Sequence, residues 1–63
     1  MNRTEIFRRH VGDILVCERR STGRVFAAKL EEIRGDFLIF RSSSGQLTAN
    51  NAADVVSFVV KNV

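Results

Sequence analysis

The pattern of hydrophobic and polar positions predicts a short helix at the start of the chain. Residues 2–11 carry apolar side chains at helical spacing, with Glu5 in the first turn and cationic residues near the end, an order that suits the helix dipole. Asn2 or Thr4 is the expected N-cap, and Gly12 is the expected stop. A helix this short is not stable alone in water, so its apolar face must dock on the rest of the chain.

From residue 13 onward the apolar residues alternate with polar ones, which indicates strands. Phe26, Ala28 and Leu30 share one face of the longest segment. The alternation slips at residues 31–33, which predicts a β-bulge and a bend. Strands are expected over residues 13–20, 24–34, 37–41, 46–50 and 55–61, with a turn or a single helical turn over 51–54.

The last strand, "VVSFVV", offers apolar side chains to both of its faces. Strict alternation places Val55 with Ser57 and Val59 on one face. A 63-residue chain has marginal stability alone, and the single cysteine, Cys17, excludes an internal disulfide. Because uncovered apolar strands aggregate, a second copy of the chain is the simplest cover, and self-association is expected.

These elements predict a mainly β protein with one domain over residues 1–63. The expected architecture is a small, five-stranded, strongly bent antiparallel barrel of Sm-like or SH3-like type. It comprises the N-terminal helix over residues 2–11 and the barrel over residues 13–61.

The composition gives the chain a net positive charge and excludes several classes of function. The net charge is +3 with eight arginines and two lysines, and arginine suits phosphate and stacks on bases. One His and one Cys cannot complete a closed structural zinc site, and no set of side chains fits a catalytic arrangement. We expect no enzyme activity, metal or cofactor. No apolar run is long enough for a membrane span, so we expect a cytoplasmic protein without a membrane partner.

Three segments together resemble the Sm-like family, and within it the Hfq group of bacterial RNA chaperones. They are "DILVCERRSTGRVFAAKLEEIRGDFLIF", the preceding "FRRHV" and the terminal "VVSFVV". The resemblance implies a ring of six or seven identical copies, in which the last strand pairs with the next subunit. It also implies that the ring binds RNA, expected to be single-stranded, as a non-catalytic chaperone or scaffold.

The candidate RNA-binding residues fall into three groups. Two arginines adjoin at the helix end, where a ring would repeat them; their alternative role is to stabilise the helix dipole. Arg24 is one of three arginines, with Arg19 and Arg20, that flank the first hairpin, where they would alternatively discourage stray strand pairing. The resemblance implies a pore-side group of four residues, which equally suit turns. The candidates are Arg8 and Arg9, then Arg24, then Arg34, Asp36, Asn50 and Asn51.

The chain also departs from the Sm-like pattern, which leaves other functions open. Ala28 stands where the family usually carries glycine, and "NNAAD" replaces the usual Arg-Gly or Lys-His pair. Asp36 would repel phosphate. The alternative is an oligomeric small barrel that binds proteins or serves a structural role and has lost RNA binding. A third option is a double-stranded DNA binder of SH3-like type.

Overall fold

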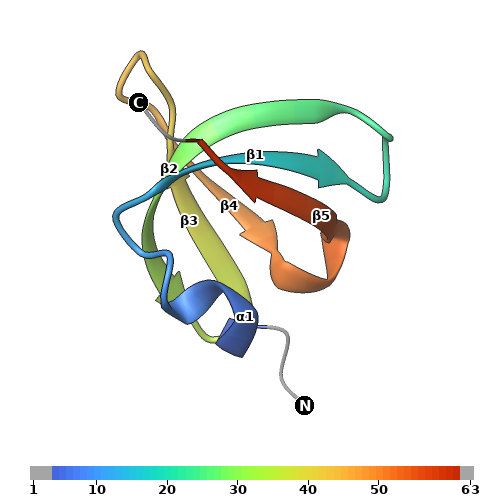
Figure 1. Cartoon of the computed structure of the whole chain (residues 1–63), viewed down its shortest axis with the longest axis horizontal. Coiled ribbons are helices and arrows are strands. Elements are labelled where there is room, and N and C mark those ends of the chain that lie inside the picture. Colours follow the sequence, from blue (N-terminus) through green and yellow to red (C-terminus); the bar gives the residue numbers. More distant parts are fainter. Residues whose placement is uncertain (1–3, 62–63) are drawn as a thin grey trace.

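The computed structural model describes residues 4–61, which form one five-stranded antiparallel sheet preceded by a short helix (Figure 1). The predicted mainly β class and the five strands are confirmed. Residues 2 and 3, where the helix was predicted to begin, lie outside the described residues. The elements are α1 (Thr4–Arg8), β1 (Ile14–Arg19), β2 (Val25–Arg34), β3 (Phe37–Arg41), β4 (Leu47–Asn51), the 3-10 helix η1 (Ala52–Asp54) and β5 (Val55–Val60).

Helix α1 ends at Arg8, earlier than the sequence predicts. The main-chain N–H of His10 donates to the carbonyl of Phe7 at 2.9 Å, and that of Asp13 donates to the carbonyl of His10 at 2.9 Å. These bonds span three residues and tighten the chain into turns. Gly12 then adopts a φ of 99°, which favours glycine. The predicted extension of the helix through residue 11 is therefore wrong.

The strands are arranged in the order β4-β3-β2-β1-β5, so β4 and β5 are edge strands that do not pair with each other. Figure 1 shows the sheet bending strongly, with β2 arching over the other strands. The register between β2 and β3 shifts between Leu30 and Glu32, which confirms the predicted bulge. The sheet is thus bent but not closed.

A second irregularity lies between β1 and β5. Glu18 is opposite Ser57 and Arg19 is opposite Val55, so Val56 is an extra residue in the ladder. Val55 is consequently buried, whereas Val56 is exposed. Strict alternation placed Val55 on the face of Ser57, and this prediction is wrong because the bulge shifts the phase by one residue.

The core fills the inner side of the bent sheet. Phe7 of α1 is 1% exposed, and its ring lies 4.7 Å from the ring of Phe58, so this contact docks the short helix. Cys17 is buried, and burial raises the pKa of its thiol to about 11. The other buried apolar residues are Leu15, Ala28, Leu30, Leu38, Phe40, Ala52 and Val55.

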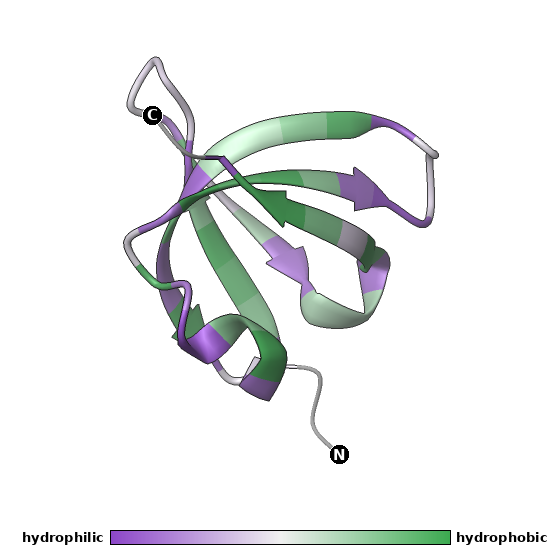
Figure 2. Cartoon of the chain, viewed as in Figure 1, coloured by the Kyte–Doolittle hydropathy of each residue, from purple (hydrophilic) through white to green (hydrophobic). Residues whose placement is uncertain are grey.

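Hydropathy differs between the two edge strands (Figure 2). Strand β5 is hydrophobic over most of its length, whereas β4 becomes hydrophilic toward its end at Asn50 and Asn51. No described helix has the length and apolar character that a membrane crossing requires. The polar end of β4 is the feature that leads to the candidate site.

Candidate nucleic-acid interface

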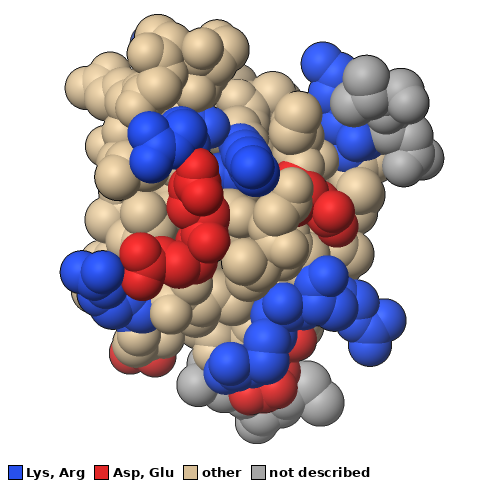
Figure 3. Space-filling model, turned by 90° about the vertical axis from the view of Figure 1, so that its left-hand side faces the viewer, with Lys and Arg blue, Asp and Glu red and all other residues tan. Residues whose placement is uncertain are grey.

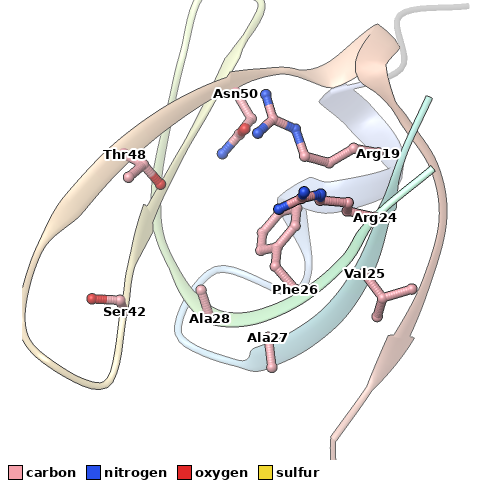
Figure 4. A pocket seen from close by; sticks show the side chains of 9 residues that line it. All are labelled: Arg19, Arg24, Val25, Phe26, Ala27, Ala28, Ser42, Thr48 and Asn50. Carbon is pink, nitrogen blue, oxygen red and sulfur yellow. The ribbon is translucent and has the colours of Figure 1, made fainter. Parts of the chain in front are cut away.

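A hollow of about 400 Å³ lies on the inner side of the bent sheet, between the start of β2 and strand β4 (Figure 4). Strand β2 pairs with β1 from Val25 onward but with β3 only from Lys29 onward. The first part of β2 therefore has no strand on its β3 side, which opens the hollow. Its walls are formed by Arg19, Arg24, Val25, Phe26, Ala27, Ala28, Ser42, Thr48 and Asn50.

The floor of the hollow is apolar and its β4 wall is polar. The ring of Phe26 packs edge-on against the ring of Phe40, with centroids 5.3 Å apart, which fixes its orientation. Thr48 and Asn50 occupy the inward-facing positions of β4 that would carry apolar side chains in a sealed core. An aromatic floor beside hydroxyl and amide groups suits a flat polar ligand, because it combines a stacking surface with hydrogen-bonding groups.

Asn50 is 8% exposed. Within residues 4–61 its side-chain amide makes no hydrogen bond, and its polar atoms are not sealed from solvent. Figure 4 shows this amide pointing into the hollow. An amide offers two N–H donors and one carbonyl acceptor, so it can match the edge of a nucleobase.

Two arginines contribute positive charge to the hollow, and none of the described residues that line it is acidic. The Nε of Arg19 lies 3.4 Å from the Oδ2 of Asp54, whereas Arg24 has no ion pair within the described residues. Figure 4 shows both side chains directed into the hollow. Arg24 therefore supplies an uncompensated cation next to the Asn50 amide.

Asp54 holds the arginine-bearing turn in place. Its Oδ1 accepts a hydrogen bond from the main-chain N–H of Ser21 at 2.9 Å, and its Oδ2 accepts one from the Ser21 hydroxyl at 3.1 Å. Burial acts to raise the pKa of Asp54, but the bonds from Ser21 and Arg19 outweigh it and hold the pKa below its ordinary value of 3.8. The carboxylate thus stays charged and connects the turn between β1 and β2 to the start of β5.

Of the residues predicted from sequence, Arg24 and Asn50 meet in this hollow. Asn50 and Asn51, which were both pore-side candidates, are consecutive on a strand and so lie on opposite faces. The Oδ1 of Asn51 accepts from the main-chain N–H of Ala53 at 2.9 Å and caps η1. The structure therefore separates the two asparagines.

The other pore-side candidates lie at the far end of β2. Arg34 pairs with Glu32 across 3.2 Å, and the carbonyl of Asp36 accepts from the main-chain N–H of Ala52 at 2.9 Å. The bond from Ala52 holds the turn between β2 and β3 against the end of β4, whereas the Arg34–Glu32 pair lies within β2. The side chains of Arg34 and Asp36 do not line the hollow.

The helix-end candidates are also separate from the hollow. Arg8 lies 3.3 Å from Glu5, and Arg9 has no ion pair among residues 4–61. Arg3, which the sequence places one to two turns before them, lies outside the described residues. Figure 3 shows acidic and basic side chains interspersed on one face of the molecule, so that face does not present a continuous positive surface.

Phe26 and Thr48 line the hollow but were not sequence candidates, whereas Arg19 was placed by the sequence beside Arg24 at the first hairpin. Thr48 and Asn50 are polar residues two positions apart on a strand, and that spacing places both on the same face. Polar side chains on the inward-facing side of a strand indicate that this side borders an open hollow and not a packed core. The sequence placed Arg19 at the first hairpin, but its contact with Asp54, which is distant in sequence, could not be predicted.

Among the described residues, no three His, Cys, Asp or Glu side chains gather in a way that could hold a metal ion. The groups that the hollow offers to a ligand are cationic, amide and aromatic side chains. Comparison of the chain with protein-family models, curated proteins and solved structures finds no match.

Proposed function

We propose that this protein binds single-stranded RNA without catalysing a reaction, and that the hollow holds an unstacked nucleobase. One observation carries the proposal: the Arg24 guanidinium and the Asn50 amide, neither with a protein partner in the described chain, face a hollow floored by Phe26. Proteins recognise single-stranded RNA by stacking bases on flat side chains and by bonding to base edges. Arg24 also attracts the phosphate backbone.

The bent sheet and the resemblance to Sm-like proteins support a barrel that is completed by neighbouring copies. Neither edge strand, "LTANN" of β4 or "VVSFVV" of β5, contains proline or a charged residue. Natural edge strands usually carry such residues to prevent pairing. We propose that β4 of one copy pairs with β5 of the next and closes a ring of six or seven subunits, as the resemblance implies. A ring would repeat the hollow in every subunit, so that several weak sites could bind one RNA with a higher overall affinity.

A polarisation titration with short U-rich and A-rich RNAs at several salt concentrations tests this function. We compare Arg24→Gln with Arg20→Gln, which removes the same charge from an exposed position outside the hollow. Binding should weaken with salt, and Arg24→Gln should weaken it by about tenfold, as expected for one charge-assisted hydrogen bond. Arg20→Gln should have a smaller effect. No binding at low salt, or equal losses in both variants, would contradict the proposed site.

A protein-interaction role is the second candidate, and the mixed charge in Figure 3 favours it. Within residues 4–61, five acidic residues lie within 4.0 Å of a basic partner, and on the face in Figure 3 the two signs of charge alternate. A patterned surface of this kind discriminates between protein partners. A stable assembly that binds no RNA at low salt would favour this candidate.

A further inference from the structure

A second hollow, of about 370 Å³, adjoins the first on the other side of the β2 edge. Three cationic side chains line it, those of Lys29, Arg41 and Lys61, together with the hydroxyl-bearing Ser43. Among the described residues that line it, none is acidic. The hollow therefore has the composition of a site for an anion.

The three cations occupy one row across four neighbouring strands. Arg41 of β3 is the partner of Lys29 on β2, and Lys29 is the partner of Ile14 on β1. The main-chain N–H of Lys61, just after β5, donates to the carbonyl of Ile14 at 2.8 Å. Partners in an antiparallel sheet have Cβ atoms about 4.5–5.5 Å apart, so the strands place the bases of the Lys29 and Arg41 side chains next to each other and that of Lys61 on the far side of Ile14.

Acidic groups neutralise only part of the positive charge of this row. The Nε of Arg41 pairs with Glu31, and its terminal nitrogen donates to the carbonyl of Gly45 at 2.9 Å. Lys29 and Lys61 have no ion pair within residues 4–61. Ile14 lies between Lys29 and Lys61 in the row, so an anion placed over Ile14 would be attracted by both lysines.

The two hollows are connected along the open edge of β2. They share Ala27, Ala28 and Ser42 as lining residues. Because β2 pairs with β3 only from Lys29 onward, no strand separates the hollows beside residues 25–28. A flexible polar chain can therefore pass from one hollow to the other across this edge.

We propose that the RNA chain crosses the β2 edge, with a base in the Arg24–Asn50 hollow and a neighbouring phosphodiester between Lys29 and Lys61. This inference rests on the proposed RNA binding and adds that the ligand spans at least two nucleotides. The phosphate is held by charge and by the row geometry, so the lysine contribution is independent of base sequence.

A double-mutant cycle between the protein's lysines and the phosphodiester linkages of the RNA tests the phosphate contact. The ligands are one hexanucleotide RNA with natural linkages and the same sequence with uncharged methylphosphonate linkages. The proteins are the wild type, Lys29→Gln/Lys61→Gln, and the charge-matched control Arg9→Gln/Arg20→Gln, whose side chains line neither hollow. Removing the backbone charge should weaken wild-type binding by about tenfold or more, and this loss should be several-fold smaller in the lysine variant only.

The outcomes separate this inference from the proposed function. Arg24→Gln can weaken RNA binding while the lysine variant and the control lose the same affinity when the RNA linkages are made uncharged. In that case RNA binding stands and the crossing path is wrong. If the wild type binds no RNA at low salt, both proposals fail. If uncharged linkages cost less affinity in the lysine variant than in the wild type and the control, the result supports the proposed path of the RNA across the β2 edge.

Lysine acylation gives an independent readout, because Lys29 and Lys61 are the only lysines in the chain. Bound RNA should protect both from an amine-reactive ester, as mapped by mass spectrometry of the peptides. A polyglutamate peptide should protect them less, since it lacks a base for the first hollow. Equal protection by polyglutamate would overturn the phosphate assignment in favour of an acidic protein segment, and absence of protection by RNA would overturn the path.

Discussion

The Asp54 carboxylate accepts a hydrogen bond from the main-chain N–H of Ser21 at 2.9 Å, although 33 residues separate the two in sequence. The Arg20 N–H also donates to the main-chain carbonyl of Asp54, at 2.6 Å. Together these bonds join the turn between β1 and β2 to the start of β5. Because Arg19 and Arg24 flank that turn, the same contacts position the cations of the candidate site.

Asp54→Asn is predicted to lower both the thermal midpoint and RNA affinity. The amide is neutral, so it loses the attraction to Arg19 and weakens the bonds from Ser21. Thermal unfolding followed by circular dichroism measures the first effect and polarisation titration the second. Asp36→Asn is the control, because the Asp36 side chain lines no part of the hollow. An unchanged midpoint for Asp54→Asn would contradict the anchoring role.

The pH dependence of stability should report the same carboxylate. The folded protein lowers the pKa of Asp54 below 3.8, so the stabilisation is fully present above about pH 3.8 and is lost as the pH falls through the folded pKa. The difference in midpoint between wild type and Asp54→Asn should be large near pH 6 and should shrink below pH 3.8. A difference that stays constant down to pH 2 would show that the charge is not the cause.

Phe7→Ala is predicted to destabilise the fold by about 3–5 kcal/mol, the usual range for a buried Phe replaced by Ala. Phe7 is 1% exposed and packs on Phe58, so its removal leaves a cavity beneath the helix. Such a loss is comparable to the whole stability of a domain this small. Urea unfolding measures it, and Ile6→Ala is the control, since Ile6 is 43% exposed. Equal effects of the two variants would contradict the docking of α1 through Phe7.

Cys17 is predicted to be unreactive in the native protein. Its pKa of about 11 leaves little thiolate at pH 8, and its side chain is buried. Iodoacetamide should therefore modify the thiol at pH 8 only when the chain unfolds, with a rate that rises in urea. Rapid modification of the wild type without denaturant would contradict the burial of β1.

Ala49→Pro is predicted to disrupt the assembly. The Ser42 N–H donates to the carbonyl of Gln46 at 2.9 Å, and antiparallel pairing alternates from that pair. The main-chain groups of Thr48 therefore face β3, whereas the N–H of Ala49 faces the free edge. Proline removes this donor and is tolerated at strand edges.

Light scattering measures the consequence of this change. The wild type should have a mass of several subunits, Ala49→Pro a much smaller mass, and the control Ala49→Thr the wild-type mass. A wild-type mass of one subunit in a folded sample would contradict assembly through β4.

Local pattern was sufficient to predict much of the fold, but not the site. The inward face formed by Phe26, Ala28 and Leu30 and the bulge near Glu31 follow from alternation within one segment. The bulge at Val56 was missed because it depends on how β5 pairs with β1.

The candidate site depends on contacts between residues that are distant in sequence, which the local pattern cannot reveal. Arg24 and Asn50 were identified individually as candidates, but only the open edge of β2 brings them into one hollow. The Sm-like resemblance grouped Asn51 with Asn50, although a strand directs adjacent residues to opposite faces. The role of Arg19 required knowledge of its contact with Asp54.

The most direct test of the proposed RNA site is a nuclear magnetic resonance titration of ¹⁵N-labelled protein with a short single-stranded RNA. The proposal predicts that the amide signals of Arg24, Phe26 and Asn50 shift in a saturable manner, while those of Arg34 and Asp36 change little. Shifts confined to Arg34 and Asp36, or no shifts at low salt, would contradict RNA binding in the hollow.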